Sequence, residues 1–124
     1  INTEAEEYRE MASNYYALAS IASKRGDYDR AVGYARAALE NDKRMENSVG
    51  IAADLKGLGI IHFRKGDTQD AYEYMKKSFL VYETLGLRKQ LIDTLGYLEE
   101  FARALDRPEE AEVYRESLNN LKEQ

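Results

Sequence analysis

A short polar motif recurs in this chain at a spacing of forty residues. Lys24–Ala31 returns as Arg64–Ala71, and a rougher copy occupies Arg103–Ala111. Each copy has basic residues, then a glycine or a polar pair, and finally an alanine. Cations and glycine are favoured where a helix ends, and the alanine lies where the next helix begins. A fixed period of this length is the signature of a repeat architecture.

Apolar side chains stay in phase with the motif over all three copies. Counted from Ala31, Ala71 and Ala111, they recur at fixed positions before and after each alanine. The aligned sets are Met11, Ile51 and Leu91; Tyr15, Leu55 and Leu95; Leu18, Leu58 and Leu98; Ile21, Ile61 and Phe101; and Tyr34, Tyr74 and Tyr114. The repeating unit is therefore a pair of antiparallel helices that must stack on its neighbours to bury its apolar stripe.

Cap and turn signals predict six helices and no strand. The first begins after a capping box at Thr3 and Glu6, and Gly26 ends it. The second helix follows Asp27 and runs to about residue 44. The next three are expected at about 49–65, 68–85 and 88–105, and the sixth follows from Pro108. Asp27 is expected to cap the second helix, and Gly86 with Leu87 predicts a Schellman turn.

Glycines within the third predicted helix call for a separate explanation. Gly50, Gly57 and Gly59 each cost a helix about 1 kcal/mol relative to alanine. They predict a close approach by another helix.

The residues that carry the period resemble the tetratricopeptide repeat family. The match rests on Leu18-Ala19 and Leu58-Gly59, on the Gly-Asp pairs at 26–27 and 66–67, and on the aromatic residue three positions after each motif alanine. The resemblance implies an all-α, right-handed α-solenoid of three antiparallel helix pairs. It also implies one domain over 1–124, with repeats 6–45, 46–85 and 86–124, in the forty-residue variant of the family.

The third copy departs from this pattern. Glu99 replaces the small residue, and Asp106-Arg107 replaces Gly-Asp. The sixth helix is therefore expected either to be a polar terminal cap or to need a following element.

The resemblance also implies a concave groove, lined by the first helix of each pair, that binds a peptide or a partner helix. Ile60 and Phe63 lie off the repeat stripe and would anchor such a segment, and basic residues would surround them. An alternative is that both side chains pack against the neighbouring repeat. The candidate groove residues are Tyr16, Ser20, Lys24, Lys56, Ile60, Phe63, Arg64 and Arg103. The Lys and Asn pattern that binds chaperone C-termini in this family is absent.

Residues for catalysis or metal binding are scarce. The chain has no cysteine, and His62, its one histidine, falls on the buried stripe. Metal sites of the usual nitrogen and sulfur type are therefore not expected. The acidic residues at 99–100 and 109–112 are interpreted as solvated helix faces. No glycine-rich phosphate loop is present. We predict no enzyme activity, no cofactor and no metal site.

Charge and hydropathy bear on partners and location. The net charge of −5 disfavours nucleic acid. No apolar run reaches the roughly 18 residues of a membrane span, and no signal-peptide pattern is present, so a cytoplasmic location is predicted. The chain begins at Ile1, which suggests a piece of a longer protein.

Three functional hypotheses remain open. The first is a scaffold module that binds a peptide or protein. The second is a homo-oligomer formed through the end helices. Tyrosines off the repeat columns (Tyr16, Tyr72, Tyr82 and Tyr97) would supply amphipathic surface for either of these two functions. The third is a regulatory segment of a larger signalling or transcription protein.

Overall fold

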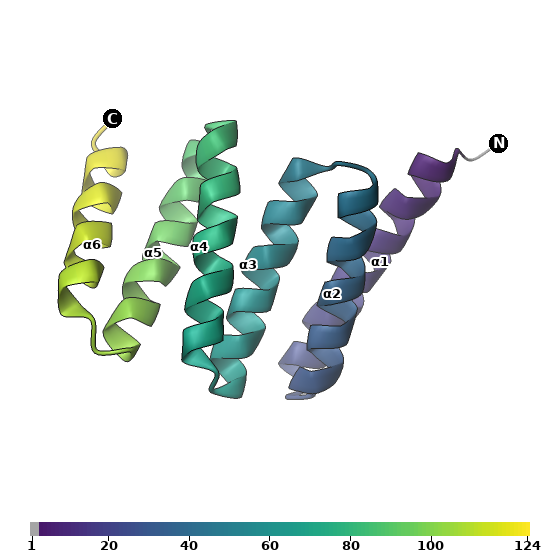
Figure 1. Ribbon diagram of the computed structural model, residues 1–124, viewed down its shortest axis with the longest axis horizontal. Helices are drawn as coiled ribbons and strands as arrows, with labels where there is room; N and C mark the ends of the chain where they lie inside the picture. The colour runs from purple at the N-terminus through teal and green to yellow at the C-terminus, as the bar shows by residue number, and fades with distance from the viewer. Residues whose placement is uncertain (1–2) are drawn as a thin grey trace.

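The computed structural model describes residues 3–124 as six α-helices without a strand. The helices are α1 (Glu4–Lys24), α2 (Tyr28–Arg44), α3 (Ser48–Lys65), α4 (Thr68–Leu85), α5 (Arg88–Ala104) and α6 (Pro108–Lys122). They form three antiparallel hairpins side by side, with the chain termini at opposite ends of the array (Figure 1). The all-α solenoid predicted from the sequence is confirmed. The repeat boundaries at 45 and 85 stay a prediction.

Every turn between helices has the same backbone geometry. Residues 26, 46, 66, 86 and 106 all have positive φ, between 55° and 101°. In each turn the amide of the following residue donates to a carbonyl five positions earlier, as in Asp27 N to Ala22 O (2.9 Å) and Leu87 N to Tyr82 O (3.2 Å). This hydrogen bond defines the Schellman motif. The five turn residues lie twenty positions apart, so each helix with its turn takes up twenty residues. Two such units account for the forty-residue spacing of the motif.

Helix starts follow the prediction only in part. Thr3 accepts a hydrogen bond from Glu6 N (3.1 Å) and caps α1 as expected. Asp27 lies at the N-cap of α2, but its carboxylate does not cap the helix. It pairs with Arg30 instead, at 3.4 Å. The predicted N-cap position of Asp27 is confirmed, but the side-chain hydrogen bond expected of a capping residue is absent.

The core lies where helices of adjacent hairpins pack. The motif alanines Ala31, Ala71 and Ala111 are all fully buried, because a methyl group lets two helices of a hairpin approach closely. Gly59 has the predicted role, since an added Cβ would lie 3.2 Å from the Ala71 carbonyl oxygen of α4. Gly57 differs: an added Cβ would meet only Tyr16, at 3.9 Å. The prediction of close helix approach therefore holds for Gly59 and not for Gly57.

Three residues expected on the surface are buried. Glu99 is 8% exposed, because Arg103 of its own helix and Arg115 of α6 both bind its carboxylate, at 3.0 and 2.9 Å. Tyr72 and Tyr82 are also buried. The Tyr72 hydroxyl donates to Glu110 (2.6 Å) and lies 2.9 Å from the Tyr114 hydroxyl, which ties α4 to α6. The assignment of these side chains to solvated or sticky surface is wrong.

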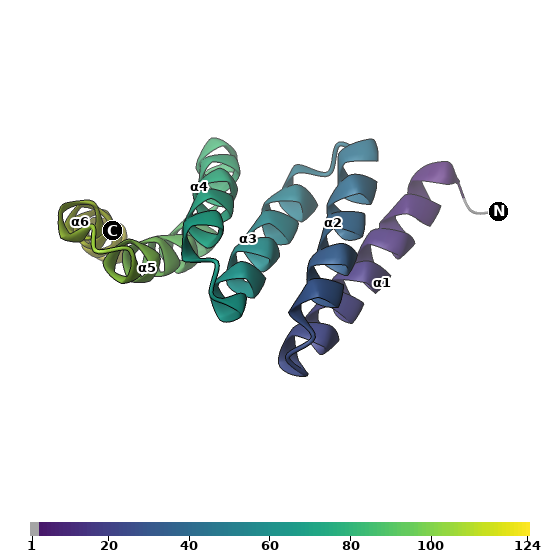
Figure 2. The same ribbon diagram turned by 60° about the horizontal axis from the view of Figure 1, so that its bottom comes forward.

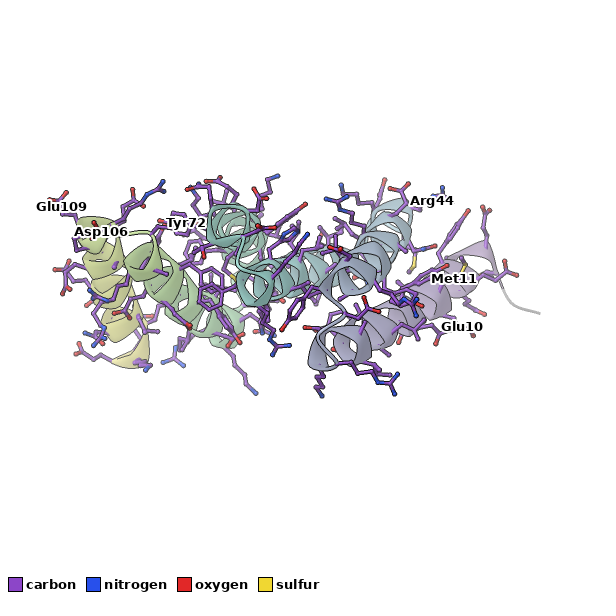
Figure 3. All side chains as sticks on the ribbon, turned by 90° about the horizontal axis from the view of Figure 1, so that it is seen from below. Glu10, Met11, Arg44, Tyr72, Asp106 and Glu109 are labelled. Atoms are coloured by element: carbon purple, nitrogen blue, oxygen red, sulfur yellow. The ribbon has the colours of Figure 1, made fainter. Side chains whose placement is uncertain are left out.

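The first repeat exposes the stripe that the other repeats bury. Met11, Leu18 and Ile21 are 42%, 40% and 48% exposed, and Figure 3 shows Met11 at the N-terminal end of the array. The equivalents of Leu18 and Ile21 in α3 and α5 are buried in clusters that include side chains of the preceding hairpin, and the equivalents of Met11 are half-buried. Within the described residues, α1 has no preceding helix to cover it.

The hairpins turn relative to one another along the array. In Figure 2, α1 lies obliquely across the view while α6 is seen almost end-on. A progressive rotation of this kind gives a helical solenoid its superhelical twist. No helix among residues 3–124 combines the length and the apolar character needed to cross a bilayer.

Candidate functional site

Two neighbouring cavities lie along the line where α1 faces α3. The first has a volume of about 130 Å³, and five of the eight candidate groove residues line it. These are Tyr16, Ser20 and Lys24 from α1, and Ile60 and Arg64 from α3. The sequence prediction therefore brings together side chains from two helices that are separated by about forty residues in the chain.

A hydrogen bond joins the two helices at one end of this cavity, and a glycine leaves space along its wall. Arg64 donates from Nη1 to Ser23 Oγ at 2.7 Å, which joins α3 to α1. Gly57 lines the cavity opposite Tyr16 and has no side chain to fill it. Tyr16 is exposed, with its ring at the surface of the cavity. A flat aromatic ring, serine hydroxyls and two cations thus surround a small apolar space.

The other three candidate residues lie elsewhere. Lys56 pairs with Asp93 of α5 and lies 5.7 Å from the centre of the Tyr97 ring. Phe63 stacks on Phe101 at 4.5 Å between ring centres, within the core shared by the second and third hairpins. Arg103 binds Glu99 and Glu112 at the α5–α6 end. None of these three side chains lines the first cavity: Lys56 and Phe63 join the second and third hairpins, and Arg103 joins the two helices of the third.

The second cavity, of about 240 Å³, contains acids that the sequence reasoning did not select. Asp42 from the last turns of α2 and Asp54 from α3 both line it, together with Arg9, Ser13 and Tyr16 of α1. Asp54 lines the first cavity too. A signal was present in the sequence, because Asp54 falls three residues after Ile51 and four before Leu58, on the apolar stripe of its helix.

The two carboxyl groups form a buried pair. Asp54 is 2% exposed, and its Oδ2 has no hydrogen-bond partner. Asp42 Oδ1 accepts from Asn47 Nδ2 at 3.1 Å, and the bare α-carbon of Gly50 makes room for it, since a Cβ there would lie 2.6 Å from the Asp42 carboxyl carbon. Burial, and then the hydrogen bond to Asp42, raise the pKa of Asp54 to about 9. At neutral pH the pair therefore holds one proton.

One further cluster could in principle hold a metal ion. His62, Asp67 and Asp70 bring one ligand atom each within 4.8 Å of one another. His62 is buried, as predicted, and its ring stacks on Tyr74. Cations surround the cluster, however: Lys65 lies 3.8 Å from Asp67, and Arg36 and Lys77 line the adjoining cavity. Their positive charge opposes the binding of a metal cation.

Comparisons with known proteins agree with this architecture. Residues 15–47 match the family model described as a tetratricopeptide repeat. The fold is similar to the crystal structure of BtubC (BKLC) from P. vanneervenii, with a TM-score of 0.85 and 20% identity over 90% of this chain and 46% of that one. The chain thus spans a little under half of BtubC.

A second solved structure matches over almost its whole length. The crystal structure of the TPR domain of Arabidopsis FLU has a TM-score of 0.86 and 14% identity, over 94% of this chain and 98% of that one. A comparison with curated protein sequences finds no match. At these identities the structural likeness concerns the fold. Residues 15–47 thus resemble a tetratricopeptide repeat in sequence, and the chain shares the fold of a tetratricopeptide repeat domain, a solenoid of three helical hairpins.

Proposed function

We propose that the chain is a non-catalytic scaffold module that binds a peptide or a partner helix in the groove formed by the two cavities between α1 and α3. The tetratricopeptide repeat fold generally mediates protein–protein interaction. The observation that supports this groove is the convergence of Tyr16, Ser20 and Lys24 with Ile60 and Arg64 around one cavity. An exposed tyrosine, small polar groups and cations beside apolar space are typical of a surface that binds a protein segment.

The groove has a definite charge pattern. Lys24 and Arg64 lie at the end nearest the α1–α2 and α3–α4 turns, and the acids lie toward the start of α3. Asp54 and Arg64 are ten residues apart on one helix, which at 1.5 Å per residue is about 15 Å. An extended segment of about five residues would cover that distance. The bound segment is therefore expected to be short.

A pair of matched variants tests the proposal. Random peptides displayed on phage would be selected against the protein, and bound peptides would be compared on two variants. Gly57→Gln places a long side chain in the groove, whereas Gly33→Gln adds the same side chain on an exposed face of α2, where a Cβ meets nothing within 4 Å. Both changes remove a helical glycine, so both should be tolerated.

The expected result is a loss of peptide binding of at least tenfold for Gly57→Gln and no change for Gly33→Gln. Equal binding by the two variants would show that the peptides bind elsewhere. Selection of no peptide at all would count against a peptide-binding groove.

Self-association is a second candidate function, and the exposed stripe of α1 favours it. Met11, Leu18 and Ile21 form an apolar surface of the type that packs in the other hairpins. A second copy of the chain would cover this stripe without using the groove. A role as the regulatory segment of a larger signalling or transcription protein is compatible with either surface. The complete gene sequence would test that role.

The remaining proposals follow from composition. A net charge of −5 and the scattered basic residues disfavour nucleic acid and acidic membranes as partners. We retain a cytoplasmic location as a proposal, and fractionation of cells that express the full-length protein would test it.

A further inference from the structure

Asp42 and Asp54 are a buried pair of acids, and among residues 3–124 neither forms an ion pair with the cations that line the same cavities. The influences that raise the pKa of Asp54 are burial and the Asp42 carboxyl group, and no basic group counteracts them. Among residues 3–124, Oδ2 of Asp54 also lacks any hydrogen-bond donor. A free carboxyl oxygen without a donor is costly in a protein interior. An apolar side chain on this stripe of α3 would be the more stable choice.

The pair lies in the groove rather than deep in the core. Asp54 lines both cavities, and Tyr16 lines both as well. The carboxyl group of Asp42 is held in place by Asn47 and by the bare surface of Gly50. A perturbed acid, held by its neighbours and placed in a cleft, is a candidate binding group.

We propose that the Asp42–Asp54 pair is the specificity element of the groove and receives the guanidinium group of an arginine from the bound segment. The proposal rests on the proposed function, because the arginine belongs to a segment bound between α1 and α3. A guanidinium group presents several N–H donors in a planar fork, which suits two adjacent carboxyl groups. One N–H would donate to the free Asp54 Oδ2, and another would donate to Asp42.

Binding of a cation should release a proton. Before binding, the pair shares one proton, and the arriving positive charge favours the form in which both acids are ionised. The proton then leaves to solvent, so affinity rises with pH while the free pair still holds its proton. The other titratable or charged groups that share a cavity with Asp54 are Arg9, Tyr16 and Lys24 of α1 and Arg64 of α3, and Tyr82 of α4 also couples to it.

An NMR titration with two small probes tests the site on the intact chain. N-acetyl-arginine amide carries the guanidinium group, and N-acetyl-citrulline amide is its neutral analogue of nearly the same shape. The arginine probe should shift the backbone amide resonances of Gly50 and Gly57, which line the two cavities. The citrulline probe should bind at least tenfold more weakly. Affinity for the arginine probe should rise by up to tenfold for each unit of pH between about 6 and 8.

Variants assign the effect to the pair. Asp54→Asn keeps the size of the side chain and a donor toward Asp42, but it removes the ionisable group. It should lose the preference for arginine over citrulline and the dependence on pH. Asp70→Asn is the control, because Asp70 is an exposed acid outside both cavities, and it should bind like the unmodified protein. If Asp54→Asn does not fold, the comparison of the two probes on the unmodified protein still decides the question.

The outcomes separate this inference from the proposed function. Equal binding of the two probes, or shifts confined to other surfaces, would overturn the arginine site. Peptides that bind the groove without an enrichment in arginine, and that bind Asp54→Asn unchanged, would overturn it too and leave the peptide-binding function standing. Arginine-specific shifts at Gly50 and Gly57 would support the site even if phage selection yielded no peptide.

Discussion

Two turn residues with side chains adopt the left-handed backbone conformation, which costs the folded state free energy. Three of the five turn positions are glycine, and the other two are Glu46 and Asp106, with φ of 55° and 58°. A residue with a Cβ pays about 1–2 kcal/mol to adopt this conformation, although aspartate tolerates it better than most. The repeat therefore carries backbone strain at two of its five turns.

Glycine at these two positions should stabilise the protein. We expect Glu46→Gly and Asp106→Gly each to raise the free energy of unfolding by about 0.5–1 kcal/mol, since part of the gain is offset by the greater freedom of glycine in the unfolded chain. Urea unfolding followed by circular dichroism would measure the change. Gly66→Ala, at φ 101°, is the reverse control and should destabilise. A loss of stability in both glycine variants would show that the turns are not strained.

The Asp42–Asp54 pair predicts an unusual dependence of stability on pH. An ordinary aspartate ionises near 3.8, whereas the pKa of Asp54 in the folded protein is about 9. Between these values the folded state holds a proton that the unfolded state has lost, so stability falls as pH rises, by up to about 1.4 kcal/mol per unit.

Asp54→Asn should lack this slope and become more stable than the unmodified protein as pH increases. Urea unfolding of both proteins from about pH 5 to pH 8 would measure it. Parallel stability curves for the two proteins would contradict a shared proton at the pair.

At the scale of the helix, the α5–α6 hairpin depends on a buried acid that no single-helix pattern reveals. Burial alone would raise the pKa of Glu99, but hydrogen bonds from Arg103 and Arg115 outweigh it and hold the pKa below the ordinary 4.5. The folded state therefore favours ionised Glu99. Its contribution to stability is complete above pH 4.5 and is lost as pH falls through the lower folded-state pKa.

Glu99→Gln should cost about 1.5–3 kcal/mol at neutral pH, the usual range for hydrogen bonds to a charged group. The difference should shrink in acid, where Glu99 of the unmodified protein is also protonated. Glu112→Gln is the matched control, because Glu112 binds the same Arg103 but is mostly exposed; its cost should stay below about 1 kcal/mol. Chemical unfolding at neutral and acidic pH would compare the three proteins. Equal losses in both variants would refute a special role for burial at Glu99.

The contrast between Glu99 and Gly66 shows what a sequence can and cannot predict here. Local chemistry determines the helix ends, and the turn at Gly66 follows from one glycine with its neighbours. The environment of Glu99 depends on Arg115, sixteen residues away on another helix. The candidate groove residues show the same contrast. The repeat period is enough to predict that Tyr16 and Arg64 lie around one cavity. It does not predict that Phe63 stacks on Phe101, because that contact depends on how the third hairpin packs.

At the scale of the whole molecule, the two ends of the array differ in character. In the middle of the array, Val32 and Leu39 of α2 pack against the core cluster that contains Leu58 and Ile61 of α3. Eighty residues on, the positions in α6 equivalent to Val32 and Leu39 are Glu112 and Asn119, and both are exposed. The face of α6 is thus polar at these two positions, and the choice between a terminal cap and a following element stays a prediction.

The opposite end presents the exposed stripe of α1, and this asymmetry predicts how copies would associate. Head-to-tail stacking would place Leu18 and Ile21 of one copy against Glu112 and Asn119 of the next, an unfavourable match that disfavours filaments. Pairing of two α1 stripes covers apolar surface on both copies and stops at a dimer.

Sedimentation across concentration should therefore show a monomer–dimer equilibrium that Leu18→Glu abolishes without loss of stability, because Leu18 is already 40% exposed. Val113→Glu, on an exposed face of α6, is the control and should dimerise normally. A protein that stays monomeric at high concentration would exclude a second copy as the cover for α1. A preceding helix would then be the remaining way to bury the stripe.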